Sequence, residues 1–311
     1  MGPIEMPAAE VDIDVAMVAE LVAEQFPSWR GQTIAPLASG WDNAVFRLGH
    51  ELLVRLPRRA AGADLVEGEQ RWLPLLAPRL PLPISAPVAM GRPGCGYPWR
   101  WSVCPWFAGD IAARTLPADL GVAADALGAF LVALHQPAHP DAPRNSVRGG
   151  PLVTRDERTR AMVDQLGETI DRRVVLDAWD RALATPSADG EDLWLHGDLH
   201  PANLIVDDGR LAAVIDFGDL TGGDPATDLS VAWMLFDEPE RARFRRSAGP
   251  AAADDATWAR AKGWATTLAV AHLANSADNQ AIAAIGWRTL HAVLADPSPD
   301  AAGGHSGSTG G

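Results

Sequence analysis

The sequence is short of cysteine and of long apolar runs. It contains two cysteines, Cys95 and Cys104, among 311 residues. This number is too small for a disulfide framework, and it lacks the second pair of ligands that a zinc site would need. No apolar run approaches the roughly 20 residues that cross a bilayer, and residues 1–10 carry no basic segment typical of a signal peptide. We therefore expect a soluble, cytoplasmic protein with no membrane partner.

The sequence is also poor in positive charge. It has 26 Lys and Arg residues against 40 Asp and Glu residues, a formal net charge of −14. A strongly negative surface repels nucleic acids and anionic membranes, so we expect neither as a partner. The charge favours a cationic small molecule, although acidity by itself also serves solubility. Lys262 is the single lysine, so any role that proteins usually give to lysine must fall to arginine here.

What the sequence does have, in its first third, is a set of short strands. Apolar and alternating runs separated by glycine turns predict a small antiparallel sheet with one inserted helix. A helix that Asp14 can cap precedes the sheet. The predicted strands are 32–37, 43–48, 52–56, 84–90 and 99–106, and the inserted helix is 61–76.

The rest of the chain is predicted to be mainly helical. Apolar residues recur at helical spacing in 118–135, 155–184 and most of 224–295, whereas 194–216 reads as short strands around the turn 207–209. The nearly half apolar composition provides for one large core or two modest ones. The sequence thus predicts an α+β fold. Its parts are an N-terminal lobe 1–106, a larger helical lobe 107–297 and a flexible tail 298–311.

The residues suited to chemistry are concentrated between positions 195 and 219. Asn203 follows Asp198 by five residues, and Asp216 follows Asn203 by thirteen. Phosphoryl transfer requires a positioned acceptor hydroxyl and a metal that neutralises phosphate charge. Asp198 can orient the hydroxyl and take its proton, while Asn203 and Asp216 can hold Mg²⁺. The segments read Leu195-His196-Gly197-Asp198-Leu199-His200-Pro201-Ala202-Asn203 and Ile215-Asp216-Phe217-Gly218-Asp219.

This ordered set resembles the catalytic loop of protein kinases, except that Gly197 stands where kinases have arginine. The variant, together with the downstream Asp224-Pro225-Ala226-Thr227-Asp228-Leu229, is more similar to the aminoglycoside phosphotransferase and choline kinase superfamily. The resemblance implies a bilobal protein-kinase-like fold and ATP or GTP as the phosphate donor with Mg²⁺. It also implies a small-molecule acceptor, first of all an aminoglycoside antibiotic.

The same resemblance assigns the N-terminal strands to the nucleotide. The turn containing Ser39, Gly40 and Asn43 occupies the place of the phosphate loop, although it lacks the glycine-rich pattern of kinases. Arg55 stands where the family has its phosphate-binding lysine. Arginine can pair with phosphate oxygens and stays charged, so this departure either preserves binding with altered geometry or marks a damaged site.

Two further sets of residues complete the predicted nucleotide site. Glu69 is expected to steady Arg55, with Glu67 as the alternative and an exposed acidic helix face as the competing interpretation of both. Backbone groups where the last strand enters the helical part match the hinge that binds a purine edge, and Trp106 is also a candidate purine neighbour. Trp99, Trp101 and Trp106 fit a core cluster equally well. The hinge positions are Cys104, Trp106 and Phe107.

Several polar residues near the motif have plainer interpretations. His196 is expected to brace the loop by hydrogen bonds and not to act as the base, because geometry must support a base assignment. The role of His200 stays open. Asp224 and Asp228 are interpreted as loop and helix-cap residues.

The acceptor is the least determined part of the prediction. Asp237, Glu238 and Asp278 lie in segments that can line a cleft for drug amines, or they are solvated charges at helix ends. A macrolide or an amino alcohol is the alternative acceptor. A non-catalytic nucleotide-binding module, disabled through Arg55, is the alternative from another class, although intact Asp198 and its metal ligands argue against it. A protein-kinase role is disfavoured because 217–240 leaves little room for an activation segment.

Overall fold

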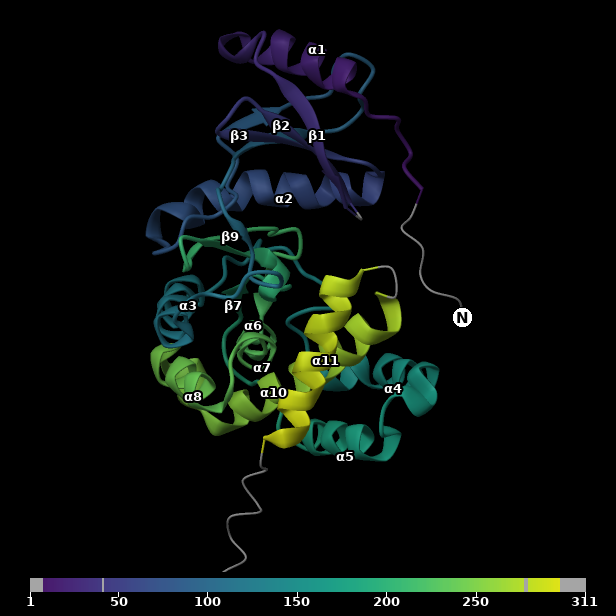
Figure 1. Cartoon of the computed structure of the whole chain (residues 1–311), viewed down its shortest axis with the longest axis vertical. Coiled ribbons are helices and arrows are strands. Elements are labelled where there is room, and N and C mark those ends of the chain that lie inside the picture. The colour runs from purple at the N-terminus through teal and green to yellow at the C-terminus, as the bar shows by residue number, and fades with distance from the viewer. Residues whose placement is uncertain (1–7, 41, 277–278, 297–311) are drawn as a thin grey trace, which may run out of the picture.

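The N-terminal part of the protein is one antiparallel sheet, seen in the computed structural model of residues 8–40, 42–276 and 279–296 (Figure 1). The sheet has five strands in the order β1-β2-β3-β5-β4. β3 lies in its centre, where Arg55 faces Val45 of β2 and Ser102 of β5. The strands are β1 (Ile34–Ser39), β2 (Asn43–Leu48), β3 (Leu52–Pro57), β4 (Ala89–Gly91) and β5 (Trp101–Pro105).

The predicted strand 84–90 is wrong for most of its length. Only its last two residues belong to β4. Ile84 instead forms an isolated bridge with Val214 in the helical part. Pro83 and Pro87 lack the N–H groups that a continuous ladder requires. This proline-rich segment therefore crosses from the inserted helix back to the sheet without pairing along its length.

Two helices cover opposite faces of the sheet, α1 (Val15–Gln25) and α2 (Ala60–Leu76) (Figure 1). Asp14 caps α1 as predicted, because its Oδ1 accepts a hydrogen bond from Met17 N at 2.8 Å. α2 lies between the sheet and the helical part, and its buried Trp72 and Leu73 join the core of the helical part. α2 therefore connects the central strand with the segment that carries the motif.

The helical part is built around the long helix α10. α10 packs against α11, α4, α5 and α6. The predicted helical stretch 155–184 is interrupted at Gly167, whose φ of +55° ends α4. The helices are α3 (Leu120–Leu134), α4 (Asp156–Leu166), α5 (Arg172–Leu183), α6 (Ala226–Leu229), α7 (Val231–Leu235), α8 (Glu238–Ser247), α9 (Gly249–Ala253), α10 (Asp255–Asn275) and α11 (Gln280–Ala295). Single 3₁₀ turns occupy 27–29, 77–79, 152–155, 167–169 and 201–203.

Short strands in the helical part hold the motif. They pair in the orders β6-β8-β9 and β10-β7. Asp208 and Gly209, with φ values of 47° and 72°, form the predicted hairpin turn between β8 and β9, since two consecutive positive φ angles are typical of such tight turns. The strands are β6 (Asp110–Ile111), β7 (Leu193–Leu195), β8 (Leu204–Asp207), β9 (Arg210–Val214) and β10 (Thr221–Gly223).

The remaining features concern membrane-spanning helices, the single lysine and the residues outside the described ranges. In the ranges that the structure describes, every helix is too short or too polar to cross a membrane. Lys262 on α10 is half-buried, and its Nζ donates to the backbone oxygen of Asp296 at 2.7 Å. The predicted tail 298–311 and Asp278 lie outside the described residues.

Candidate active site

The loop that carries Asp198 turns sharply at Gly197. Gly197 has a φ of +86°, and a Cβ atom there would lie 2.1 Å from the backbone oxygen of Asp219. Both the backbone conformation and the close approach exclude any side chain. The departure from the kinase pattern at this position thus has a local physical reason.

The side chain of Asp228 holds the backbone of this loop in place. Its carboxylate is fully buried and accepts hydrogen bonds from the backbone N–H groups of His196 at 2.8 Å and Gly197 at 2.9 Å. His135 Nε2 lies 3.2 Å from the same carboxylate. The predicted role of Asp228 as a simple cap is therefore too narrow, because its side chain fixes the backbone next to Asp198.

His196 is also fully buried and has no free ring nitrogen. Its Nδ1 accepts from the backbone N–H of Asp198 at 3.2 Å, so the proton resides on Nε2, which donates to the oxygen of Ile215 at 2.9 Å. The ring packs against Phe217 with 4.4 Å between centroids. These contacts fit the bracing role predicted for His196 and join the Asp198 loop to the segment that carries Asp216.

Both carboxylate oxygens of Asp198 are engaged by neighbouring side chains. Oδ1 lies 2.9 Å from Arg148 Nη2, and Oδ2 lies 3.3 Å from His200 Nε2. His200 Nδ1 accepts from Ala202 N, so Nε2 is the protonated nitrogen that faces Asp198. Burial alone would raise the pKa of Asp198, but His200 and Arg148 together lower it well below its usual value. Asp198 is therefore ionised at neutral pH.

Asn203 and Asp216 are brought together by backbone contacts. Asn203 Nδ2 donates to the backbone oxygen of Asp198 at 2.9 Å, which leaves Oδ1 as the free amide oxygen. The backbone oxygen of Asn203 accepts from Ile215 N at 3.0 Å, next to Asp216. Asp216 has a φ of +63°, an uncommon conformation that is frequent at functional sites.

A ligand pair of one amide oxygen and one carboxylate suits Mg²⁺. It would not suffice for a metal ion that is coordinated by protein groups alone. Mg²⁺ keeps several waters and is usually bound by one or two protein oxygens together with substrate phosphates. Among the described residues, no group of three or more His, Cys, Asp or Glu side chains is placed to hold a metal ion. Asn203 Oδ1 and the Asp216 carboxylate are the two groups present that would hold Mg²⁺, and their role as ligands stays a prediction.

Arg55 joins the sheet to the motif. Its Nη1 lies 2.9 Å from Glu69 Oε2 on α2, and its Nη2 lies 3.5 Å from Asp216 Oδ1. Glu67, the alternative partner, pairs instead with Arg100. Burial raises the pKa of Glu69, an effect that Arg55 opposes. The arginine at the lysine position thus contacts both the steadying glutamate and a predicted metal ligand.

The predicted phosphate loop is the tip of the β1–β2 hairpin. Gly40 N donates to Asn43 O at 2.9 Å, so this amide is already paired. The Asn43 side-chain oxygen is buried and has no hydrogen-bond donor among the residues that the structure describes. Ser39 ends β1 opposite Ala44. In the described part of the tip, the Asn43 side-chain oxygen is therefore the buried side-chain atom that is left without a partner.

At the predicted hinge, Cys104 is buried and both the backbone N–H and the ring of Trp106 already have partners. Cys104 is fully buried in β5, and burial raises the pKa of its thiol to about 12. The backbone N–H of Trp106 donates to Glu51 O at 2.7 Å, and the Arg47 guanidinium lies 4.0 Å from the Trp106 ring centroid. Phe107 is half-buried beside it. Arg47 thus occupies one face of the Trp106 ring that we considered for a purine.

Two of the three predicted acceptor residues, Asp237 and Glu238, lie at the start of α8, whereas Asp278 lies outside the described residues. Asp237 precedes the helix, and its Oδ1 lies 3.0 Å from Arg288 Nη2 on α11. Glu238 is exposed in the first turn of α8. The carboxylate of Asp237 is thus already paired with a cation, and the role of both residues in binding an amine stays a prediction.

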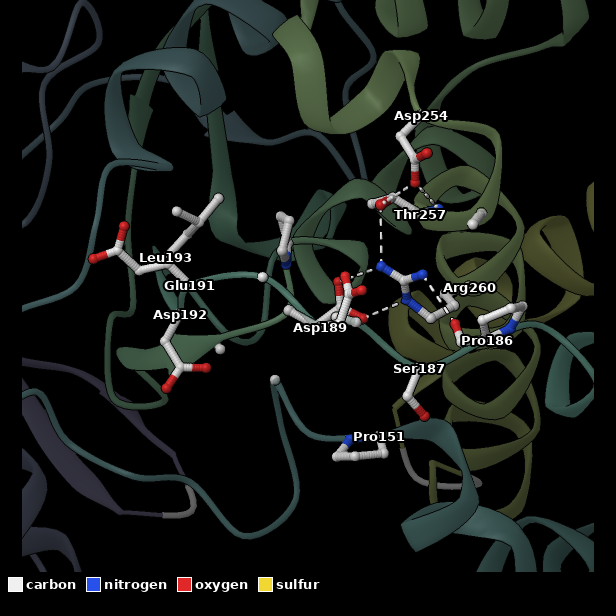
Figure 2. Close-up of a pocket in the computed structure, with 17 residues that line it drawn as sticks. Pro151, Pro186, Ser187, Asp189, Glu191, Asp192, Leu193, Asp254, Thr257 and Arg260 are labelled. Carbon is white, nitrogen blue, oxygen red and sulfur yellow. Dashed lines mark hydrogen bonds and ion pairs between the residues drawn. The ribbon is translucent and has the colours of Figure 1, made fainter.

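The contact of Asp198 with Arg148, which lies fifty residues earlier in the chain, was not predicted from the sequence. The structure also contains a hollow of about 640 Å³, whose lining includes Gly149 and Pro151 and which the sequence did not predict (Figure 2). Arg260 in this hollow is saturated, since it pairs with Asp224 Oδ2 at 2.6 Å and donates to Pro186 O at 3.1 Å. The hollow therefore offers no unpaired cation.

Solved structures with a similar fold include antibiotic phosphotransferases. Wild-type aminoglycoside 2'-phosphotransferase-IIIa in complex with GDP gives a TM-score of 0.64 at 19% identity, covering 91% of this chain and 99% of that chain. The GDP and kanamycin complex of APH(2")-IIia gives 0.67 at 21%, covering 89% and 98%. Macrolide 2'-phosphotransferase type I gives 0.60 at 21%, covering 91% and 99%. At these identities the likeness establishes the fold, and the predicted bilobal kinase-like α+β architecture is confirmed.

Sequence comparison leads to the same class of protein. YcbJ of Bacillus subtilis (strain 168) is 37% identical over 51 residues, which are 16% of this chain and 17% of that protein. The match thus spans less than a fifth of the length of this curated relative. The profile described as the Phosphotransferase enzyme family matches residues 33–264, most of the chain. The predictions of family and of phosphotransferase activity are therefore confirmed, and the chain belongs to the Phosphotransferase enzyme family.

Proposed function

We propose that the protein transfers the γ-phosphoryl group of ATP or GTP to a hydroxyl group of a small molecule. The observation that carries the proposal is that backbone contacts bring the segments of Asp198, Asn203 and Asp216 together. Arg55 reaches Asp216 from the sheet. Phosphoryl transfer needs this combination of an acceptor-orienting carboxylate, metal ligands and a phosphate-binding cation. Nucleotide complexes of proteins with the same fold support a nucleotide donor.

On the donor side, the sheet up to residue 106 binds the nucleotide and Arg55 grips its phosphates. Arginine offers two parallel donors, so Arg55 can exchange its contact with Asp216 for phosphate oxygens while it keeps Glu69. Mg²⁺ held by Asn203 and Asp216 would neutralise phosphate charge. ATP and GTP are abundant in the cytoplasm, where we expect the reaction to take place.

On the acceptor side, Asp198 receives the hydroxyl. The hydroxyl oxygen forms a bond to the γ-phosphorus as the bond to the β–γ bridging oxygen breaks, and the hydroxyl proton passes to Asp198. A carboxylate whose pKa lies well below its usual value is a weak base. Asp198 therefore acts chiefly by aligning the hydroxyl, which is sufficient because the transition state of phosphoryl transfer is loose.

An antibiotic is the acceptor class to test first. Proteins of the same fold include one in complex with kanamycin and a macrolide 2'-phosphotransferase. An aminoglycoside would use carboxylates, for which Asp237, Glu238 and Asp278 remain our candidates. A macrolide would need a wider apolar surface and few charges. The macrolide stays the second candidate because its phosphotransferase covers the chain as fully as the aminoglycoside enzyme does.

The test is transfer of labelled γ-phosphate from ATP and from GTP to aminoglycosides, macrolides and small amino alcohols. Asp198→Asn serves as the blank, and Asp208→Asn, an exposed turn residue, is the control for loss of one aspartate. We expect labelled product with the wild type and the control and none with the blank. Nucleotide binding without transfer to any of these acceptors would refute the antibiotic assignment and favour a non-catalytic module or a different acceptor.

A further inference from the structure

The contact that Asp198 makes outside its own motif is short and partly shielded from water. Arg148 Nη2 donates to Asp198 Oδ1 at 2.9 Å, and the two side chains are 17% and 26% exposed. An ion pair on an open surface contributes only about 0–1 kcal/mol, because water and salt screen it. A shielded hydrogen bond between two charged groups is stronger and directional, so this one restricts the Asp198 carboxylate.

Arg148 is the closer of the two described side chains that contact this carboxylate. His200 Nε2 lies 3.3 Å from the other oxygen, a distance at which a hydrogen bond is weak. His200 also belongs to the same short loop as Asp198. Arg148 comes instead from the connection between α3 and α4, fifty residues earlier. It therefore fixes the carboxylate relative to the body of the helical part.

The connection that carries this arginine is itself held on both sides. Before the arginine, Asn145 N donates to Thr221 Oγ1 at 3.1 Å. After it, Gly149 N donates to Thr227 Oγ1 at 3.1 Å, and Gly149 O accepts from Asp224 N at 2.8 Å. Backbone hydrogen bonds of this kind fix the course of the chain, so the arginine starts from a defined position.

Gly149 allows the connection to lie close to the small sheet of β7 and β10. Its φ is +70°, and a Cβ atom there would lie 3.0 Å from Leu195 Cδ1 and 3.3 Å from Gly223 Cα. Any other residue would meet both a left-handed backbone and this crowding. Leu195 pairs with Thr221 across the sheet, and β7 leads directly into the loop of Asp198. The same two strands thus position the arginine and the aspartate.

Asn145 extends the attachment to the second segment of the motif. Its Nδ2 donates to Asp219 Oδ1 at 2.5 Å, and its Oδ1 accepts from Val147 N at 2.9 Å. The connection 145–149 therefore contacts both segments of the motif, one through Asn145 and the other through Arg148.

We propose that Arg148 is a positioning residue for phosphoryl transfer, which holds the Asp198 carboxylate in the orientation that receives the acceptor hydroxyl. The inference rests on the proposed function. An ionised carboxylate has about four lone-pair positions, so Asp198 can keep its bond to Arg148 and still accept a hydrogen bond from the hydroxyl. Arg148 acts through Asp198 and contacts neither the acceptor nor the nucleotide.

Orientation is the property that this carboxylate needs most. The transition state of phosphoryl transfer is loose, so the group on the acceptor side contributes mainly alignment. A misplacement of about 1 Å in such a group can lower the rate about 10²-fold. The terminal torsion of an aspartate side chain has broad energy wells. The bond from Arg148 removes this freedom before the acceptor arrives.

The first experiment compares variants in the transfer assay. Arg148→Met keeps an unbranched side chain and removes every donor, whereas Arg148→Lys keeps one charged donor. The matched control is Arg144→Met, because Arg144 lies in the same connection but pairs with Asp192, outside the motif. We expect Arg148→Met to lower kcat about 10²-fold, with the KM values of nucleotide and acceptor within about twofold of the wild type. Arg148→Lys should lower kcat about three- to tenfold, and the control should keep it within about twofold.

Two kinetic results would overturn the positioning role. If Arg148→Met turns over as fast as the control or faster, the pairing only makes Asp198 a weaker base. If either KM rises as much as kcat falls, Arg148 contacts a substrate directly and does not act through Asp198.

The second experiment needs no turnover. Crystal structures of Arg148→Met and Arg144→Met are compared at the Asp198 side chain. We expect the carboxylate to rotate away or to occupy two orientations in Arg148→Met alone, with the backbone at Gly197 unchanged. A carboxylate that keeps its orientation in Arg148→Met would mean that His200 is sufficient to hold it, which refutes the proposal.

The two proposals fail in different ways. A rotated carboxylate in Arg148→Met, without transfer by the wild type to any acceptor, would support the hold on Asp198 and refute the kinase proposal. Transfer that Arg148→Met leaves unchanged would do the reverse. Far-UV circular dichroism establishes that each variant is folded. If Arg148→Met does not fold, Arg148→Lys decides the matter, and a kcat equal to that of the wild type then overturns the positioning role.

Discussion

Replacing Arg55 by methionine is expected to destabilise the protein strongly. Arg55 is 7% exposed and its partner Glu69 is 2% exposed, with 2.9 Å between the charged atoms. The variant leaves a buried carboxylate without its cation, which in comparable sites lowers the free energy of unfolding by about 3–5 kcal/mol. Against a typical total stability of about 5–15 kcal/mol, this is a large fraction.

The double variant Arg55→Met/Glu69→Met distinguishes a loss of charge balance from a loss of packing. It removes both charges and keeps the volume, so we expect its stability to lie within about 1 kcal/mol of the wild type. Arg55→Lys keeps the charge and the contact with Glu69 but loses the second arm that reaches Asp216 at 3.5 Å. We expect it to lose about 1 kcal/mol and to bind nucleotide differently, because a lysine has one donor centre and not a fork.

The assay is equilibrium unfolding in urea, followed by tryptophan fluorescence and by far-UV circular dichroism. Coincident transitions justify a two-state treatment. The reasoning is refuted if the double variant is destabilised by the sum of the two single variants. That result would mean that Arg55 and Glu69 contribute independently, by packing, and that their contact carries no coupling energy.

Three further predictions concern the motif and its surroundings. Asp198→Asn should lower kcat by about 10²- to 10⁴-fold, while calorimetry shows nucleotide affinity within twofold of the wild type; equal turnover would remove Asp198 from the mechanism. Gly197→Ala should lower the free energy of unfolding by more than about 2 kcal/mol, because the left-handed φ adds about 1–2 kcal/mol of strain to the 2.1 Å approach to Asp219 O; an unchanged Tm would contradict the turn described here. Burial, with repulsion from nearby cations, lowers the pKa of His272 to about 3, so the unfolded chain binds one more proton between pH 6.5 and that value and stability falls as the pH drops. Between pH 6.5 and 5.5 this loss is about 1 kcal/mol, and it should disappear from urea titrations of His272→Asn; a pH dependence identical to the wild type would show that the ring is not the cause.

The site residues whose positions were easiest to predict from the sequence are those that local turns bring together. Asp198 and Asn203 are separated by a tight loop, and Asp216 is delivered by the next hairpin, so local turns bring the three together. The spacing alone carries that information. The fold class could be predicted in the same way, from a change of apolar period near residue 106 and not from any single residue.

What escaped prediction depends on contacts between distant segments. Glu67 and Glu69 lie on the same helix two residues apart, and only the packing of α2 against β3 turns Glu69 toward Arg55. Arg148 lies in a polar connection without apolar period, and its placement depends on anchors more than seventy residues further along the chain. No local pattern encodes such contacts.

The contact of Asp228 with the motif could also be recognised only in the folded chain. From the sequence, Asp224 and Asp228 are interpreted as loop and helix-cap residues. In the fold the carboxylate of Asp228 turns back to the loop of His196 and Gly197 and accepts two backbone hydrogen bonds. A cap and a brace use the same short acidic side chain, so the sequence could not separate them.

The single lysine has a practical consequence for chemical probes of this enzyme. Reagents that acylate the phosphate-site lysine of kinases need an ε-amine there. At the position that we propose for phosphate binding, this protein has the guanidinium of Arg55, which is not nucleophilic at neutral pH. The only ε-amine in the chain belongs to Lys262, whose ammonium is bonded to Asp296 on the helical side of the molecule. Lysine-directed nucleotide probes should therefore overlook this enzyme in a mixture of kinases, and lysine-directed covalent inhibitors should spare it.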